Sequence, residues 1–271
     1  MSNSIDTLPK LGMGTYRLEG DIGFQSVKMA LELGYRHIDT AQIYNNEEQV
    51  GQAIAESGIA REELFVTTKV WNSSLNKENF IDSVKESLSK LQLSYVDLLL
   101  IHWPSPEGNH SMQEYLQELQ HAKALGLTKH IGVSNFTIAQ LKEAMDILGS
   151  DNIFTNQVEV HPYLTNQKLV SYCQQNNIHI TGYMPFAVGK VLSDPVINEL
   201  ADEYKVSCAE IVIAWMHALG LATIPSSTKR DNLAANLKAL SLTLKAEDVE
   251  RINQLNRNDR QAAPDFSPEW D

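Results

Sequence analysis

Short apolar runs alternate with longer amphipathic stretches along most of this chain, and this alternation constrains the fold more than any other feature. Residues 64–68 form a β-branched and aromatic run, and residues 96–101 are almost continuously apolar. Such runs are typical of strands buried on both faces, as in a parallel sheet. The same pattern predicts further strands at 130–133, 153–158, 179–183 and 221–224.

Helical patterns occupy the intervals between these runs. Apolar residues recur there every three or four positions, which is the spacing of one buried helix face. Gly is favoured just after a helix, Ser, Thr, Asp or Asn just before it, and Pro at its first position. The predicted helices are one that ends at Gly34, one at 79–91, one that ends near Gly126, one at 138–148 with Thr137 as N-cap, and one that begins at Pro195 with Asp194 as N-cap.

About eight strand–helix units follow one another with no Pro-, Gly- or Ser-rich linker between them. Repeated units of this kind imply parallel strands with helices outside them. They can close into a barrel of roughly 250 residues or form an open doubly wound sheet. The open form most often carries a G-x-G-x-x-G turn, and residues 11–16 lack its third Gly. We therefore predict an α/β fold, a (β/α)8 TIM barrel, with residues 1–271 as a single domain.

Composition limits the classes of partner. The formal charge of −12 disfavours nucleic acid and anionic membranes, which need a basic surface. Two cysteines, Cys173 and Cys208, cannot form a disulfide framework, which favours a reducing compartment. The first ten residues lack the apolar segment of a signal peptide, and no apolar run has the roughly 20 residues of a membrane span. We expect a soluble cytoplasmic protein.

Four polar side chains stand at or just after the ends of predicted strands. Asp39, Lys69 and His102 follow three different strands, and Tyr44 lies in the loop after the first of these. In a barrel of this type, functional residues gather where strands end, at the carboxyl face. Lys69 ends an apolar strand, where an unpaired ammonium would be costly, so it needs an acidic partner, for which Asp39 is the candidate.

Each of these residues alone has an ordinary structural explanation. An Asp at a strand end is commonly a turn or cap residue, and a Lys there is commonly solvated. His102 precedes Trp-Pro and could be a packed core residue, and Tyr44 could be a half-buried surface aromatic. The four together, on neighbouring strands of one predicted rim, are much less expected by chance.

The motifs around these residues resemble the aldo-keto reductase family. The resemblance extends from Leu11 to about Leu237, and several spaced motifs in the family's order make it specific. The residues near the end of the chain and those at 224–230 resemble short bacterial members that act on 2,5-diketo-D-gluconate. The motifs are 34–41 followed by Tyr44, Glu47 and 50–51, then 68–71, 100–104, 131–136 and 156–159.

The resemblance implies NADPH-dependent reduction of carbonyls on a TIM barrel. It assigns catalysis to Asp39, Tyr44, Lys69 and His102, with Tyr44 as general acid and His102 orienting the carbonyl oxygen. We expect Lys69 to lower the pKa of Tyr44 from its free value near ~10, while Asp39 holds Lys69 in place. The implied cofactor-binding residues are Gly14, Thr15, Ser134, Asn135, Gln157, Tyr183, Ser226, Ser227, Thr228, Lys229, Arg230 and Asn236, and the implied substrate-binding residues are Tyr16, Trp71 and Trp103.

The adenosine end departs from the family's common pattern. Many members carry Lys where this chain has Ser226, and Arg where it has Asn232. Lys229 and Arg230 follow closely, and Arg suits phosphate oxygens, so we expect NADPH over NADH. The short turn-rich stretch 261–267 matches the tail that shapes the family's substrate pocket, which predicts an open site for aldehydes, keto-sugars or small dicarbonyls such as 2,5-diketo-D-gluconate and methylglyoxal.

Two other functions stay open at this stage. A barrel lyase could use Lys69 as a Schiff-base nucleophile, although this leaves Ser134, Asn135, Gln157 and Tyr183 without a role. A non-catalytic nicotinamide-nucleotide-binding subunit is the other. The eight histidines show no metal-ligand spacing, so we expect no metal site. We expect a small-molecule carbonyl substrate as partner, no nucleic acid and no membrane, and a monomer.

Overall fold

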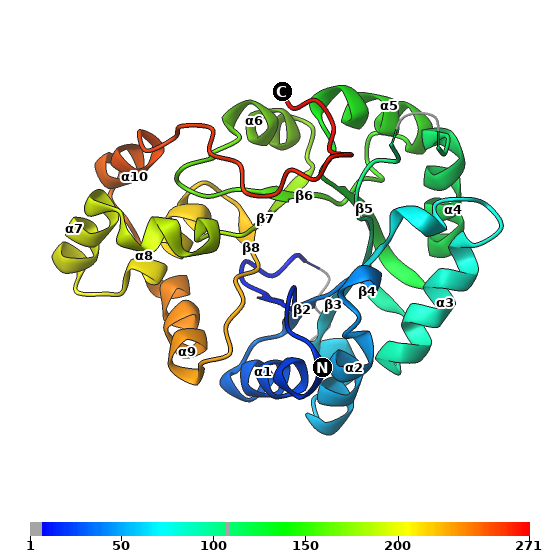
Figure 1. Cartoon of the computed structure of the whole chain (residues 1–271), viewed down its shortest axis with the longest axis horizontal. Coiled ribbons are helices and arrows are strands. Elements are labelled where there is room, and N and C mark those ends of the chain that lie inside the picture. The colour runs from blue at the N-terminus through cyan, green and yellow to red at the C-terminus, as the bar shows by residue number, and fades with distance from the viewer. Residues whose placement is uncertain (1–6, 107–108) are drawn as a thin grey trace.

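The computed structural model describes residues 7–106 and 109–271. Eight parallel strands lie side by side in the order of the sequence (Figure 1). A parallel bridge between Leu11 and Thr223 joins the last strand to the segment before the first, which closes the barrel. The predicted TIM-barrel fold is therefore confirmed. The strands are β1 Met13–Gly14, β2 His37–Asp39, β3 Phe65–Val70, β4 Val96–Ile101, β5 Thr128–Ser134, β6 Thr155–Glu159, β7 His179–Tyr183 and β8 Ala222–Thr223.

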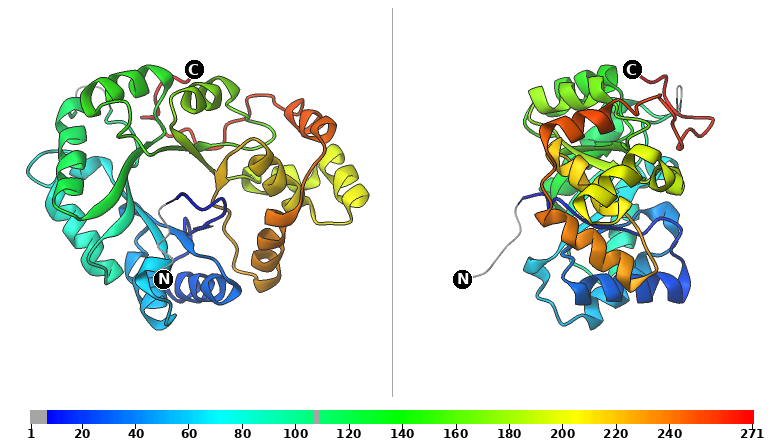
Figure 2. Two further views of the ribbon diagram at one scale, coloured as in Figure 1. Left: turned by 180° about the vertical axis from the view of Figure 1, so that it is seen from behind. Right: turned by 90° about the vertical axis from the view of Figure 1, so that its left-hand side faces the viewer.

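Helices surround the strands as an outer ring (Figures 1 and 2). Several loops contain short 3-10 turns. One of these turns, η1 (Gln42–Tyr44), carries the predicted site residue Tyr44. The α-helices are α1 Gly20–Leu33, α2 Glu47–Glu56, α3 Phe80–Leu91, α4 Met112–Ala124, α5 Ile138–Leu148, α6 Gln167–Gln175, α7 Pro195–Tyr204, α8 Cys208–Ala218, α9 Arg230–Lys238 and α10 Ala246–Asn253.

Local sequence signals determine where several of these helices begin and end. Gly34 ends α1 in the left-handed conformation, with φ of 109°, which glycine adopts at no steric cost. Thr137 and Gln140 form a capping box at the start of α5, so that two otherwise unpaired backbone N–H groups have partners. The Asp194 side chain accepts a hydrogen bond from Val196 N–H, with Pro195 as the first residue of α7. The predicted caps are confirmed.

Apolar side chains fill two regions. The larger lies between the strands and the ring of helices. The smaller is made by Phe65, Leu98 and Leu100, with Leu8 and Phe154 packed against it. His130 stacks on Phe154 with ring centroids 4.2 Å apart. Because Leu8 precedes β1 and Phe154 precedes β6, this cluster lies at the amino end of the barrel, which leaves the carboxyl end for the site.

The C-terminal segment from Asn258 to Asp271 crosses the end of the barrel opposite to the start of the described chain (Figure 2). This placement brings the last residues over the carboxyl ends of the strands. Cys173 is buried and Cys208 is partly buried, and neither forms a disulfide. Within the residues that the structure describes, no helix is long and apolar enough to cross a membrane.

Candidate active site

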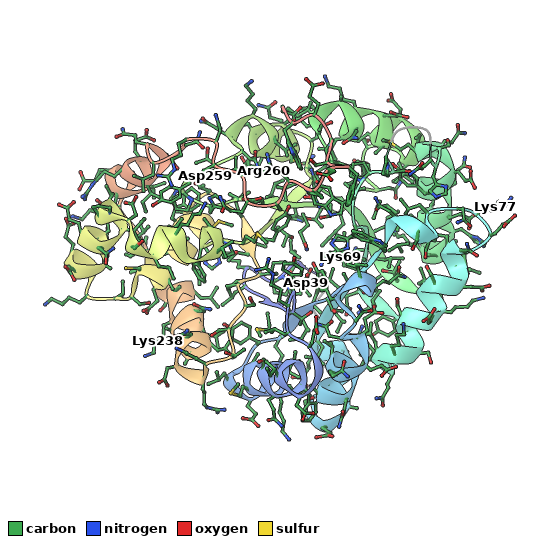
Figure 3. All side chains as sticks on the ribbon, viewed as in Figure 1. Asp39, Lys69, Lys77, Lys238, Asp259 and Arg260 are labelled. Atoms are coloured by element: carbon green, nitrogen blue, oxygen red, sulfur yellow. The ribbon has the colours of Figure 1, made fainter. Side chains whose placement is uncertain are left out.

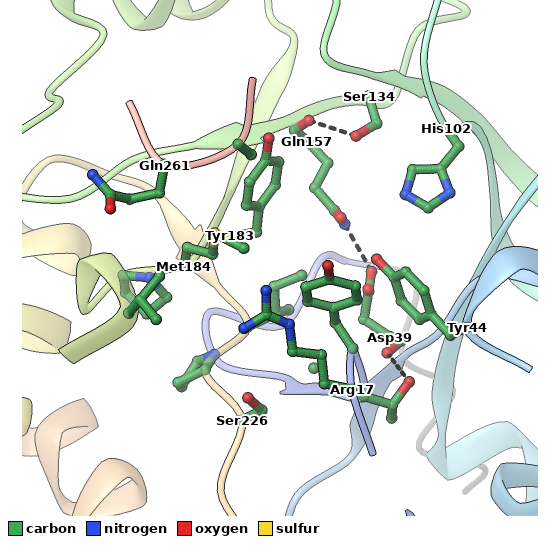
Figure 4. A pocket seen from close by; sticks show the side chains of 18 of the residues that line it. Arg17, Asp39, Tyr44, His102, Ser134, Gln157, Tyr183, Met184, Ser226 and Gln261 are labelled. Atoms are coloured by element: carbon green, nitrogen blue, oxygen red, sulfur yellow. Dashed lines mark hydrogen bonds between the residues drawn. The ribbon is translucent and has the colours of Figure 1, made fainter. Parts of the chain in front are cut away.

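A cavity of about 820 Å³ opens at the carboxyl ends of the strands (Figure 4). Its lining comes from the loop after β1, the ends of β2 to β7 with the loops that follow β2 and β7, the loop after β8, and the C-terminal segment. The sequence-predicted residues that line it are Gly14, Thr15, Tyr16, Asp39, Tyr44, Trp71, His102, Trp103, Ser134, Asn135, Gln157, Tyr183, Ser226, Ser227 and Thr228.

A buried ion pair lies at the base of this cavity. Lys69 Nζ is 2.5 Å from Asp39 Oδ1 and donates a second hydrogen bond to Thr40 O at 2.9 Å. Gln157 Nε2 donates to Asp39 Oδ2 at 2.7 Å, so both carboxylate oxygens are engaged. Asp39 and Lys69 lie in the centre of the barrel and are almost fully buried (Figure 3). The predicted pairing of Lys69 with Asp39 is present.

Tyr44 ends the 3-10 turn η1 and places its hydroxyl 3.5 Å from Lys69 Nζ. Burial raises the pKa of Tyr44 well above its ordinary value, and the negative charge of Asp39 adds to the increase. The expected net lowering of this pKa is therefore not found, because burial outweighs the effect of the Lys69 ammonium. Asp39 lies closer to the ammonium than Tyr44 does, and it offsets part of the positive charge that stabilises a phenolate. Tyr44 consequently keeps its proton at neutral pH.

The imidazole of His102 stands beside Tyr44 and Trp71. Its ring centroid is 5.5 Å from that of Tyr44 and 5.1 Å from that of Trp71, both in edge-to-face contact. Burial lowers the pKa of His102 well below its ordinary value, and the positive charge of Lys69 acts in the same direction. His102 is therefore neutral at physiological pH, and one of its ring nitrogens carries a proton that it can donate.

Burial also lowers the pKa of the Lys69 ammonium, and the Asp39 carboxylate opposes this shift. The charged pair survives in the interior because each partner has further hydrogen bonds. With the pair close to neutral overall, the reacting end of the cavity presents three proton-bearing groups. These are the Tyr44 hydroxyl, the His102 ring and, beneath them, the Lys69 ammonium.

A chain of hydrogen bonds joins the polar residues on the far side of the cavity. Tyr183 donates its hydroxyl to Asn135 Oδ1 at 2.7 Å, and Asn135 Nδ2 donates to His102 O at 3.0 Å. Ser134 Oγ donates to Gln157 O at 2.8 Å. Because each side chain is held by its neighbours, this wall is ordered before any ligand binds.

The structure separates the residues assigned to the adenosine end. Ser226, Ser227 and Thr228 line the cavity, whereas Lys229, Arg230 and Asn236 do not. Lys229 is exposed, and Arg230 pairs with Glu32 at 2.8 Å on the surface. Asn236 is buried on α9, where its side chain interacts with the Tyr35 hydroxyl.

Aromatic side chains enclose the reacting end. Phe266 from the C-terminal segment lies edge-on to Trp71 at 6.0 Å and to Trp103 at 5.7 Å, measured between ring centroids. The ring centroid of Tyr16 lies 5.2 Å from that of Tyr44. The C-terminal segment thus forms one wall of this pocket.

Sequence reasoning did not identify several residues of the lining. Arg17 extends into the cavity (Figure 4), its guanidinium carbon lies 5.0 Å from the ring centroid of Tyr16, and none of the ion pairs among the described residues includes it. The only sequence signal for Arg17 was its position directly after Tyr16. The other additional residues are Leu18, Ile43, Met184, Pro185, Phe186, Val188, Gly189, Ile224 and Pro225, whereas Gln261, Ala262, Ala263, Pro264 and Phe266 belong to the stretch 261–267 that the sequence had indicated.

Comparison with known proteins agrees with this geometry. A model of the aldo/keto reductase family matches residues 10–257. Methylglyoxal reductase DkgB of Escherichia coli O157:H7 is 52% identical over 265 residues, which are 97% of this chain and 99% of that protein. Glyoxal reductase of Bacillus subtilis is 39% identical over 256 residues, 93% of this chain and 91% of that protein.

A solved structure gives the same result at the level of the fold. The crystal structure of a Bombyx mori aldo-keto reductase in complex with NADP superposes with a TM-score of 0.88 and is 38% identical. The superposition covers 93% of this chain and 91% of that one. The match of the family model over most of the chain and the identity to full-length relatives lead to one conclusion: this chain belongs to the aldo/keto reductase family of oxidoreductases.

Proposed function

We propose that this protein reduces aldehydes, keto-sugars or small dicarbonyls such as methylglyoxal to alcohols, with NADPH as reductant and Tyr44 as general acid. The observation that carries the proposal is the placement of a protonated Tyr44 hydroxyl in the cavity, 3.5 Å from the ammonium of a buried Lys69–Asp39 pair. The glyoxal and methylglyoxal reductases among the relatives support the same class of substrate.

The lining fits a nicotinamide dinucleotide. The cavity runs from Tyr44 to the hydroxyls of Ser226, Ser227 and Thr228, and Tyr183 offers an aromatic ring between these ends. Arg17, which has no carboxylate partner among the described residues, suits an anion such as a phosphate. The polar wall of Ser134, Asn135 and Gln157 offers hydrogen-bonding groups for a carboxamide.

Each catalytic residue has a defined task in this proposal. When bound, NADPH supplies a hydride to the carbonyl carbon. Tyr44 gives its phenolic proton to the carbonyl oxygen as that oxygen gains negative charge, so the product is a neutral alcohol, and the phenolate then regains a proton from water. His102 donates a hydrogen bond that orients the same oxygen. Lys69 stabilises the transient phenolate, and Asp39 and Gln157 keep Lys69 in position.

Substitution of Tyr44 tests this assignment. Tyr44→Phe removes the acidic proton and leaves the ring, so we expect turnover to fall by about 10²-fold or more. NADPH binding, followed by the change in nicotinamide fluorescence, should persist. Tyr172→Phe, on helix α6 outside the cavity, is the matched control. Near-normal oxidation of NADPH by Tyr44→Phe with methylglyoxal would overturn the role of Tyr44.

NADPH is expected to be preferred over NADH. Lys229 lies just beyond the hydroxyls of Ser227 and Thr228, and Arg230 lies next to it. Arg230 is half-exposed and its pair with Glu32 is a surface ion pair, so exchanging Glu32 for a phosphate costs little. A higher kcat/KM with NADH than with NADPH would refute the preference.

The Schiff-base lyase has less support than the reductase. Lys69 is fully buried and its ammonium is engaged by Asp39 and Thr40, whereas a Schiff-base lysine must reach the substrate carbon as a free amine. Borohydride reduction in the presence of methylglyoxal should leave Lys69 unlabelled by mass spectrometry. Covalent labelling at Lys69 would favour the lyase, and fluorescence changes without turnover of any carbonyl would favour a binding subunit.

We also propose that the chain acts as a cytoplasmic monomer with a single domain over residues 1–271. The acidic composition and the two free cysteines agree with a reducing compartment. Light scattering on the purified protein measures the mass directly, and a mass near 30.3 kDa is expected for a monomer.

A further inference from the structure

Glu159 is a fully buried carboxylate that the proposed chemistry does not use. It ends β6, two residues after Gln157, and alternate residues of a strand point to the same face. Glu159 therefore points to the same face of β6 as Gln157, and as the last residue of the strand it lies at the carboxyl end of the barrel, where the site is. A buried carboxylate is costly unless both of its oxygens have partners, so the partners of Glu159 indicate what it does.

Those partners come from the C-terminal segment. Glu159 Oε1 accepts a hydrogen bond from Gln261 N–H at 2.7 Å, and Oε2 accepts one from Ala262 N–H at 2.7 Å. His161 Nε2 lies 2.8 Å from Oε1 and orients the carboxylate from the other side. Two consecutive backbone amides thus bind one carboxylate, and hydrogen bonds to a charged acceptor are stronger than those between neutral groups.

Further contacts hold the same end of the segment. Arg260 Nη2 donates to Asn166 Oδ1 at 3.2 Å, and Asn166 Nδ2 donates to the backbone oxygen of Glu159 at 2.6 Å. The Arg260 guanidinium carbon lies 3.6 Å from the ring centroid of Trp270. Figure 3 shows Asp259 and Arg260 at the barrel end, on the side of α6 and α10.

Beyond Ala262 the segment becomes a wall of the pocket. Ala263, Pro264 and Phe266 line the cavity, and Phe266 contacts Trp71 and Trp103. The far end is held more weakly, because the exposed Asp271 carboxylate accepts hydrogen bonds from Ile138 N–H at 3.0 and 3.2 Å. The buried attachment therefore lies at Glu159, between the barrel and the segment that carries Phe266.

We propose that Glu159 is a positioning residue that sets substrate selectivity by fastening the C-terminal segment, so that Phe266 completes the pocket. This inference rests on the proposed reductase function. Glu159 does not touch the reacting atoms. A substrate large enough to reach Phe266 depends on Glu159, whereas a substrate as small as methylglyoxal depends on it less.

The test replaces the Glu159 carboxylate by an amide of nearly the same size. Glu159→Gln keeps one acceptor oxygen and turns the other into an N–H donor that faces a backbone N–H group. We expect trypsin to cleave after Arg260 at least about five-fold faster, because the next residue loses its attachment. The KM for benzaldehyde should rise by roughly five-fold, equivalent to about 1 kcal/mol, while kcat changes by less than about two-fold and the KM for methylglyoxal changes less.

Asp97→Asn is the matched control. Asp97 is also fully buried and also binds a backbone amide, that of Val66, but at the amino end of the barrel. At a temperature well below the unfolding transition of each protein, Asp97→Asn should leave cleavage after Arg260 and both KM values unchanged. If Glu159→Gln does not fold, Ala262→Pro removes one N–H donor from the segment itself and should reproduce the effect.

A double-mutant cycle identifies the route of action. If Glu159 acts through Phe266, Glu159→Gln should raise the KM for benzaldehyde little further in a Phe266→Ala background. Additive effects, or a KM change with an unaltered rate of cleavage, would overturn the proposal. The cleavage assay needs neither cofactor nor substrate. A wild-type protein that reduces no carbonyl therefore refutes the proposed function, while the cleavage rates still decide whether Glu159 fastens the segment.

Discussion

At the scale of single residues, the site depends on one buried pair of charges. Asp39 and Lys69 are almost fully buried, and each has hydrogen-bond partners besides the other. Burial raises the pKa of Tyr44, and the charge of Asp39 adds to the increase, despite an ammonium 3.5 Å from the hydroxyl. The residue types were evident from the sequence, but the burial of each group and the distances among them decide which group is protonated.

Removal of one partner of this pair should be more damaging than removal of both charges. Asp39→Asn leaves the Lys69 ammonium buried without a carboxylate, so we expect a loss of about 3–5 kcal/mol of unfolding free energy. Asp39→Asn combined with Lys69→Met should recover part of that loss. Urea denaturation of the three proteins measures both effects. A single variant as stable as the wild type would contradict the role of the pair.

At the scale of secondary-structure elements, sequence and structure agree where a signal is local. Thr137, Asp194 and Gly34 each act on backbone groups within a few residues, and each is found in its predicted place. The contact between α2 and α3 is different. Gly51 is buried against the end of α3, and nothing in the sequence around it indicates which helix it meets.

Gly51→Ala should destabilise the protein, although the same change usually stabilises a helix by about 0.5–1 kcal/mol. A Cβ at position 51 would lie 2.6 Å from the carbonyl oxygens of Lys90 and Leu91, which are backbone atoms that cannot rotate away. Overpacking of this kind costs about 1–3 kcal/mol, so the net change should be a loss. Thermal unfolding measures it, and a raised Tm would contradict the contact.

At the scale of the whole molecule, the two ends of the barrel differ in chemistry. The carboxyl end holds the cavity and the polar residues, and the amino end is closed by Phe65, Phe154 and neighbouring side chains. His37 begins β2 at this closed end and is fully buried, with its Nε2 3.1 Å from Thr67 Oγ1. The burial that closes the barrel therefore also encloses a titratable group.

Acid should destabilise the fold partly through His37. Burial lowers the pKa of His37 from 6.5 to about 4. Below pH 6.5, His37 binds a proton in the unfolded chain, whereas in the folded chain it stays neutral until about pH 4. The free energy of unfolding therefore falls as the pH decreases from 6.5 to about 4. His37→Gln should reduce that fall by up to about 3 kcal/mol.

Urea denaturation at several pH values between 7 and 4 measures this slope. His179→Gln, at an exposed histidine at the start of β7, is the control and should leave the slope unchanged. The same slope in His37→Gln and in the wild type would show that the acid sensitivity arises elsewhere.

The sequence alone determined the alternation of strands and helices, the caps of several helices and the four polar residues at the strand ends. These features depend on periodicity and on neighbours within one turn or one strand, which the order of residues contains directly. Because parallel strands align their carboxyl ends, the gathering of Asp39, Lys69 and His102 at one end of the barrel also followed from the order of residues.

Only the tertiary structure decided which groups share charge, burial and contact across the molecule. In the folded chain, Asp39 lies closer to the Lys69 ammonium than Tyr44 does. Lys229 and Arg230 do not line the cavity, and residues 261–266 lie against Glu159 and the pocket. Glu159 and Gln261 are 102 positions apart in the sequence. The physical reason is that pKa shifts and pocket walls depend on distances of a few ångströms between such remote segments, and no local pattern encodes those distances.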